Sequence, residues 1–358
     1  MIDKKSALYS EFVIDGVKMS MTPIQLLTEC MTPQAKEKYQ AEGLAGQVVD
    51  ESLDSIHQRV NLDSEKTAEY LKLVVSALDR EVPIPMSILP YYAKHKVART
   101  IIDSIWRKGF HTLEDLSVSL KFRWNSSKMG SMAAFYSSVE ALVPYLFELD
   151  VLVDEVEFCE AETNLIDIEV LPQGKSKAFD FDDDPSSWLV FVPFDTCSFK
   201  LGGSVLSAVV GDNGDRPSDV HDSYYFADCY EVVRELVEDG VATGGVTVGE
   251  GGLLCAVRKM LEGVECGVEM NVGGVMSAYS GADELQILFA HVPGVVLQIA
   301  DSDYDYVDSQ FVLQDIAYFP LGHPKYGVEG VSLQKSVRSG VSGILASLLN
   351  GQAAEGED

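Results

Sequence analysis

The sequence lacks closely spaced pairs of cysteines or histidines. Six cysteines and six histidines are scattered along 358 residues. None of them forms an HExxH motif or another spacing typical of a metal or redox site. A disulfide framework and a zinc site are therefore not predicted, and we expect reduced thiols.

Long apolar runs and excess positive charge are missing too. No stretch approaches the roughly 20 uninterrupted apolar residues of a membrane helix, and residues 1–6 carry no apolar segment of the secretory type. We therefore expect a cytoplasmic protein without a membrane partner. The formal net charge is −29, from 27 basic and 56 acidic residues. Because this field repels phosphate backbones, no nucleic-acid partner is expected.

Motifs for common catalytic chemistry are absent as well. The chain contains no GxSxG elbow, no GxxxxGK[ST] loop and no dinucleotide-type GxGxxG. The acidic runs at 180–184 and 301–305 lack the glycine and the glutamate of a calcium loop. No catalytic residue can be assigned from motifs, and the identity of any bound metal stays unknown.

One basic cluster stands out against the negative charge. It comprises Lys94, His95, Lys96, Arg99, Arg107, Lys108, Lys121 and Arg123. Two interpretations remain open. The cluster either grips a phosphate or an acidic partner, or it is solvated helix surface, which is the more frequent use of such charge.

The chain does contain alternating strand and helix patterns. Apolar residues at helical spacing predict helices that begin near Asp63 or Ser64, at 94–107, from Ser131, at 230–237 and at 253–261. Short apolar or alternating runs predict strands at 165–170, 188–194, 286–289 and 295–299. This order is typical of an α/β or α+β fold in which helices cover a sheet.

Several glycine-containing turns carry a resemblance to a known family. They are Leu201-Gly202-Gly203-Ser204, then Gly211-Asp212 and Pro217-x-Asp219-Val220, and later Glu250-Gly251-Gly252-Leu253. Over about residues 80–324 the sequence resembles the second aminoimidazole-ribonucleotide-synthetase-like (PurM-like) half of large phosphoribosylformylglycinamidine synthases.

The resemblance implies a fold and a division of the chain. The fold class is α+β, with an N-terminal α/β subdomain that contains a mixed sheet and a C-terminal, sandwich-like α+β subdomain. We expect an N-terminal extension of short helices and loops at 1–62, the two subdomains at 63–195 and 196–348, and a disordered acidic tail at 349–358.

The resemblance is poor where the family's chemistry lies. Thr100 stands at the position of a metal-binding glutamate, and Ser104 at that of an asparagine. The strand around Glu157 replaces a lysine-containing segment that contacts phosphate. In the glycine turn Thr247 replaces an aspartate, while Glu250 keeps a carboxylate. The resemblance therefore implies a degenerate protein without catalytic residues.

The glycine turns allow two interpretations. The turn formed by Gly249, Glu250, Gly251 and Gly252 can cradle an anion with backbone N–H groups, as a residual nucleotide site. Alternatively its glycines serve turn geometry alone, which is the role we assign to Gly202, Gly203 and Ser204. We expect Gly203→Val and Gly252→Val to impair folding, and Glu250→Ala to leave stability near normal.

Three functional hypotheses follow from the resemblance. The favoured one is a non-catalytic interaction or structural protein that needs no cofactor and pairs with a second copy or another protein. Amidotransferase-like pseudoenzymes of viruses are a precedent, so a viral origin is expected. The alternatives bind magnesium with ATP or ADP. One is a nucleotide-binding accessory subunit; the other is an ATP-dependent ligase that works with a separate glutaminase and uses Glu250 with Asp219 or Asp222 as metal ligands.

Overall fold

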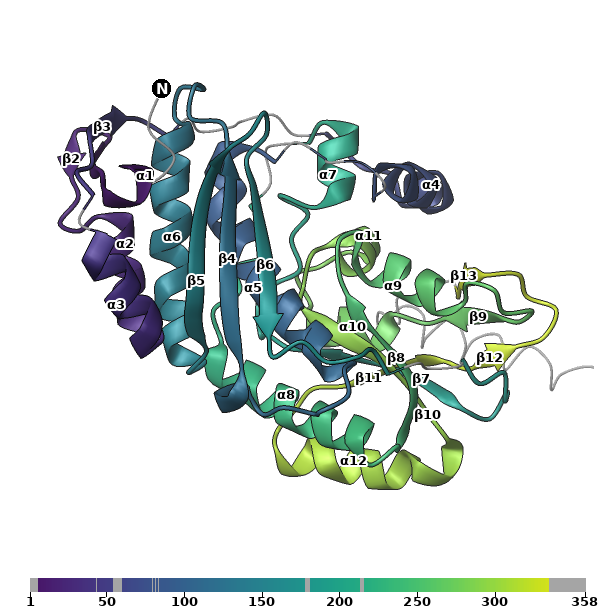
Figure 1. Ribbon diagram of the computed structural model, residues 1–358. Helices are drawn as coiled ribbons and strands as arrows, with labels where there is room; N and C mark the ends of the chain where they lie inside the picture. Colours follow the sequence, from purple (N-terminus) through teal and green to yellow (C-terminus); the bar gives the residue numbers. More distant parts are fainter. Residues whose placement is uncertain are drawn as a thin grey trace, which may run out of the picture.

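The described residues form two main sheets and two small ones, with helices packed around them (Figure 1). The computed structural model describes residues 6–42, 44–53, 60–78, 80, 82, 84–177, 181–212 and 216–334. The predicted acidic tail and the end of the predicted C-terminal subdomain lie outside the described residues.

The elements up to residue 171 lie around the first sheet, except the helix at 67–78, which packs against helices around the second sheet. In chain order they are α1 (Ser6–Tyr9), β1 (Glu11–Ile14), β2 (Val17–Lys18), α2 (Pro23–Leu27), α3 (Pro33–Glu42), β3 (Val48–Glu51), α4 (Thr67–Leu78), α5 (Leu89–Ile105), β4 (Ser117–Trp124), α6 (Ser131–Glu148), β5 (Leu152–Glu160) and β6 (Leu165–Leu171).

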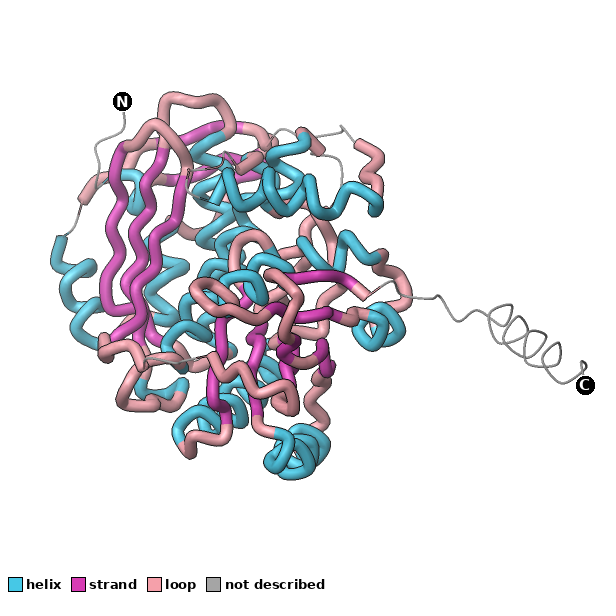
Figure 2. The backbone as a smooth tube through the Cα atoms, turned by 90° about the vertical axis from the view of Figure 1, so that its right-hand side faces the viewer, coloured by secondary structure: helices cyan, strands magenta, loops and turns pink. Residues whose placement is uncertain are grey.

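The elements after residue 187 surround the second sheet, whose strands are seen from another side in Figure 2. They are β7 (Trp188–Pro193), α7 (Val205–Val210), α8 (Ser223–Glu238), β8 (Ala242–Val248), α9 (Gly252–Met260), β9 (Gly267–Met270), α10 (Gly273–Ala278), α11 (Glu284–Phe289), β10 (Gly294–Ile299), α12 (Tyr304–Leu313), β11 (Phe319–Gly322), β12 (Pro324–Lys325) and β13 (Val331–Leu333).

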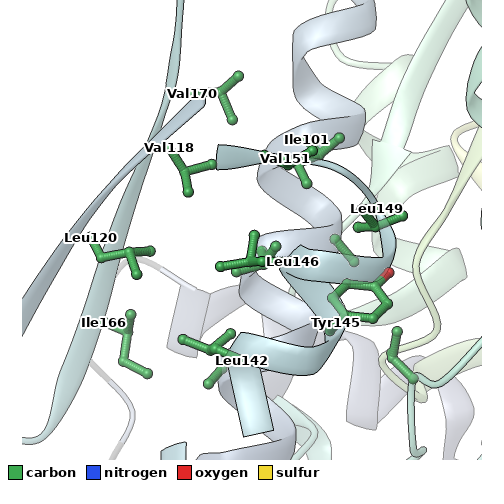
Figure 3. Packing of buried hydrophobic residues seen from close by; sticks show 14 of the residues in the cluster. Ile101, Val118, Leu120, Leu142, Tyr145, Leu146, Leu149, Val151, Ile166 and Val170 are labelled. Carbon is green, nitrogen blue, oxygen red and sulfur yellow. The ribbon is translucent and has the colours of Figure 1, made fainter. Parts of the chain in front are cut away.

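The first sheet has the strand order β5-β4-β6 and is mixed, because β4 is parallel to β5 and antiparallel to β6. Alternate residues of β4 are buried, as expected for a strand with one covered face. Helices α5 and α6 cover that face. Figure 3 shows Val118 and Leu120 facing Leu142 and Leu146 of α6 across this layer.

The stretch predicted as an N-terminal extension shares this core. Its Phe12 ring lies 5.0 Å from the ring of Tyr136 on α6. The hydroxyl of Tyr39 accepts from Val156 N and donates to Val156 O, both at 2.7 Å, so α3 closes the outer edge of β5. The predicted boundaries at 62/63 and 195/196 stay a prediction.

The second sheet is antiparallel, with the order β11-β7-β10-β8. Its two faces are both apolar, because Val190 and Val192 join the same core as α8 and α12, whereas Leu189 and Phe191 join a second core with α9 and α11. Such continuous burial is typical of a sheet covered on both sides. A small third sheet pairs β9 with β12 and β13, and a small fourth sheet pairs β1 with β2 and β3.

The predicted strand at 286–289 is wrong, because these residues end helix α11. Asp283 Oδ1 accepts from Gln286 N, and Gln286 Oε1 accepts from Asp283 N, both at 2.8 Å. This reciprocal capping box starts a helix at Glu284. The helix predicted at 94–107 also begins earlier, at Leu89, where Pro90 occupies the first turn.

The helices among the described residues are too short or too polar for a bilayer. None of them combines the length and the apolar character required to span a membrane.

Candidate functional site

Two glycine turns meet in the groove between the sheets. One joins β8 to α9, where Gly252 has φ +76° and a Cβ atom would lie 2.6 Å from Leu288 O. The other precedes α7, where Gly203 has φ +74° and a Cβ atom would lie 2.6 Å from Ile88 Cγ2. Glycine is therefore required at both positions by conformation and by space. Ser204 caps α7, because its Oγ accepts from Ser207 N at 3.1 Å.

His291 connects the two turns, and nothing in the sequence beyond an isolated histidine points to this role. Its Nε2 lies 3.3 Å from Gly251 N and 3.4 Å from Val205 N. Both partners are N–H donors, so Nε2 accepts and the ring is neutral, with its proton on Nδ1. Burial lowers the pKa of His291 to about 3.

Glu250 is held by three side chains of α5. Its Oε1 accepts from Tyr92 Oη at 3.0 Å and lies 3.1 Å from Arg99 Nη1 and 3.8 Å from Lys96 Nζ. Burial acts to raise the pKa of the Glu250 carboxyl, but the positive charges of Arg99 and Lys96 outweigh it and lower the pKa to about 2. The carboxylate is therefore ionised and already neutralised within the protein.

A cavity of about 300 Å³ lies beside these groups. Its walls include Gly203, Ser204, Glu250 and His291 together with the basic side chains of Arg80, Lys96 and Arg123. Arg123 pairs with Asp167 through Nε and Oδ2 at 2.6 Å. The cavity thus combines a neutral imidazole with cations, two of which are paired with carboxylates. This arrangement is chemically suited to a small polar or anionic group.

The residues considered as magnesium ligands do not converge. Asp219 pairs with Lys94. Asp222 caps α8, because its Oδ1 accepts from Tyr225 N at 3.1 Å, and its Oδ2 accepts from Thr196 Oγ1 at 2.9 Å. Across the part of the chain that the structure describes, no group of three or more acidic, histidine or cysteine side chains could hold a metal ion.

The positions at which the sequence departs from the resemblance have partners within the protein. Thr100 Oγ1 donates to Lys96 O at 2.7 Å within α5, and buried Ser104 Oγ lies 2.8 Å from Tyr230 Oη. Thr247 Oγ1 accepts from Trp106 Nε1 at 2.7 Å. Glu157 lies on the open face of β5 and pairs with Lys121 at 2.9 Å.

The basic cluster of the sequence is divided among several partners. Lys96 and Arg99 point to Glu250, so they are neither solvated surface nor an open phosphate grip. His95 is half-buried, and its Nε2 donates to Ser218 O at 2.9 Å. Burial lowers the pKa of this imidazole to about 4. Lys121 and Arg123 pair with acids of the first sheet.

Two bulky side chains, one of α5 and one of the residue directly after it, pack against glycines. A Cβ atom on Gly249 would lie 3.1 Å from Arg99 Cδ, and one on Gly245 would lie 2.6 Å from the Trp106 ring. Protein side chains therefore occupy the space over the face of β8 and of the following turn that lies toward α5.

Comparison with known proteins shows which proteins the chain is similar to. Residues 196–308 match the family model "AIR synthase related protein, C-terminal domain". The chain is 24% identical over 227 residues to human phosphoribosylformylglycinamidine synthase and 23% identical over 253 residues to the probable chloroplastic/mitochondrial enzyme of Arabidopsis thaliana. These stretches cover 59% and 64% of this chain. The chain is a PurM-like relative of phosphoribosylformylglycinamidine synthase.

Solved structures agree on the fold. PurLQS from Thermotoga maritima matches with a TM-score of 0.51 at 15% identity, over 70% of this chain and 41% of that one. HypE from E. coli matches with a TM-score of 0.50 at 13% identity, over 88% and 93%. The predicted PurM-like α+β fold is confirmed.

The relationship covers a part of the larger enzymes. The matched stretches make up 17% of the human and of the Arabidopsis synthase. Both glycine turns, at 202–204 and 249–252, lie inside the matched C-terminal domain. Both turns therefore fall in the part of the chain that resembles this family model.

Proposed function

We propose that this PurM-like chain is a degenerate, non-catalytic relative of phosphoribosylformylglycinamidine synthase that acts as an interaction or structural protein. A cytoplasmic location, a viral origin and pairing with a second copy or another protein are parts of this proposal. It requires no cofactor.

The pairing of Glu250 carries the proposal. A carboxylate that serves Mg²⁺ must present free oxygen lone pairs to the metal. Here Oε1 of Glu250 is taken by Tyr92 and Arg99, and Lys96 adds a second positive charge. A cation would meet repulsion from both basic side chains at this position.

The neighbouring positions support the same conclusion. Thr100 and Ser104 lie on α5 at the places where the resemblance implies polar site residues, yet both hydroxyls are used in hydrogen bonds within the protein. Trp106 packs against Gly245 and bonds Thr247, which leaves less open space beside β8. Each change exchanges a ligand-binding group for an internal contact.

The cavity of about 300 Å³ favours a second candidate. Arg80, Lys96 and Arg123 line it beside both glycine turns, and three basic residues can attract phosphate. On this alternative the chain is a nucleotide-binding accessory subunit, or an ATP-dependent ligase of purine biosynthesis that works with a separate glutaminase.

A thermal-shift titration tests the two candidates. The purified chain is heated with ADP or ATP, each with and without magnesium, because a ligand of the native state raises the melting temperature. A ligand at ten times its Kd stabilises by about 1.4 kcal/mol. The proposed function predicts no shift at millimolar nucleotide.

A saturable shift would overturn the non-catalytic proposal if the variants Lys96→Ala and Arg123→Ala removed it. Lys108→Ala, in a turn outside the cavity, is the matched control and should keep any shift. An assay with formylglycinamide ribonucleotide and ammonia would then decide between accessory subunit and ligase.

A further inference from the structure

One edge of the second sheet borders an open groove. Among the described residues β10 is the strand paired with β8, so the other side of β8 is an edge. The opposite edge strand, β11, contains Pro320, which cannot donate to an added strand. Strand β8 has no proline, and Gly244 and Gly245 carry no side chains that would block its edge, although the Trp106 ring packs over Gly245 on one face of the strand.

The groove has a volume of about 670 Å³. Three consecutive residues of β8, Gly244–Val246, form part of its wall. Successive residues of a strand point to opposite faces, so a groove that touches three in a row runs along the edge of the backbone. The β-bulge of β8 lies at Thr243, beyond this wall, and residues 244–248 pair regularly with β10.

Both walls beside the edge are defined by contacts. On one side Gln298, which is fully buried, receives a hydrogen bond from Asp182 N at 2.9 Å and donates to Asp182 O. This pair fixes the segment that carries Phe181 and Asp183. On the other side the C-terminal end of α9 and the following loop contribute Met260, Val264 and acidic residues.

The negative charge of the groove favours a basic binding partner. Asp183, Glu262 and Glu265 line it against the single cation Lys259, on a chain of net charge −29. Apolar Phe181, Met260 and Val264 lie among these charges. An extended segment with alternating basic and apolar side chains would match both features, while its backbone pairs with the edge.

We infer that the edge of β8 at Gly244–Val246 binds an extended basic segment of a partner protein as an added strand. The inference deepens the proposed interaction function and rests on it, since it names the surface and the chemistry of the partner. The site lies away from the cavity of Glu250, with which it shares no lining residue.

Fluorescence anisotropy with the full chain tests the inference. The probe is a fluorescein-labelled eight-residue peptide of alternating valine and lysine. We expect saturable binding that weakens at least tenfold when the valines are N-methylated, because methylation removes backbone donors and keeps the charge. The double variant Glu262→Lys/Glu265→Lys should weaken binding at least tenfold.

The variant Glu114→Lys/Glu140→Lys is the matched control, because both glutamates are exposed, lie far from the groove in sequence, and change the net charge equally. It should bind within twofold of the parent chain. Equal losses in the two variants, equal binding of the methylated peptide, or no binding at all would overturn the inference.

Hydrogen exchange identifies the contacted strand. Amides at alternate positions of 244–248 should exchange rapidly in the free chain and at least tenfold more slowly with the peptide. Slow exchange in the free chain would overturn the inference, because the edge would then be covered by the chain itself. If the peptide does not bind and nucleotides give no thermal shift, this inference is refuted, and the proposed function still stands.

Discussion

Glu250 and its two cations lie on different elements, so their pairing depends on the packing of α5 against the turn before α9. The sequence identified Glu250 as the remaining carboxylate of the turn, and it identified Lys96 and Arg99 as basic residues. It could not join them, because more than 150 residues separate Lys96 from Glu250. His291 was missed for the same reason, since its partners are backbone groups of two distant turns.

Replacement of Glu250 should reduce stability, contrary to the near-normal stability expected from the sequence. In Glu250→Gln the partly buried Arg99 and Lys96 lose their counter-charge, and we expect a loss of about 1 to 3 kcal/mol in the free energy of unfolding. Urea denaturation measures it. Glu157→Gln, which breaks an exposed pair with Lys121, is the control and should have little effect. Equal effects of the two would refute the structural role of Glu250.

The half-buried imidazole of His291 should make stability depend on pH. Its pKa is about 3 in the folded chain, below the value of 6.5 for an exposed histidine. Between these values the unfolded chain binds a proton that the folded chain excludes, so stability falls as the pH decreases from 6.5. His95 contributes in the same direction, and Glu250, which faces His291, does so only below pH 4.5.

The variant His291→Gln isolates this effect. Its free energy of unfolding should be lower at pH 7 and should fall less steeply between pH 6.5 and 5, by about 1 kcal/mol per pH unit. Urea titrations at four pH values across this range measure both slopes. Parallel curves for the variant and the parent chain would show that His291 is protonated in the folded state.

At the level of elements, amphipathic helices, glycine turns and the strands at 165–170, 188–194 and 295–299 followed from the sequence, while the strand at 286–289 did not. The run at 286–289 is too short to distinguish strand from helix by periodicity. The reciprocal hydrogen bonds between Asp283 and Gln286 stabilise the start of a helix. Such a capping box is present in the sequence and is the signal that the strand prediction overlooked.

The turn before α9 provides a prediction with a close internal control. Gly252→Ala would place a Cβ atom 2.6 Å from Leu288 O at φ +76°, whereas Gly240→Ala has φ +74° and no atom within 4 Å. We expect Gly240→Ala to cost about 1 to 2 kcal/mol for backbone strain alone. Gly252→Ala should cost clearly more, and Gly252→Val should prevent folding. Chemical denaturation compares them, and equal losses would mean that the turn can relax.

Across the whole molecule, the two predicted subdomains share their packing. The core around the first sheet includes Val295 and Leu297 of β10, and the second core includes Val74 of α4. The resemblance implied two subdomains, at 63–195 and 196–348. It could not predict that β10 and α4 each join the core of the other unit, since side-chain patterns show that a face is apolar without showing what covers it.

Shared cores imply a single cooperative unfolding transition. Leu297→Ala removes a fully buried side chain of the second sheet, and we expect a loss of about 2 to 4 kcal/mol. Because Leu297 lies in the core that also contains β4, amides of β4 and β10 should lose the same protection free energy in hydrogen exchange with urea. If β10 alone lost protection, the first sheet would be stable by itself. The two subdomains would then unfold independently.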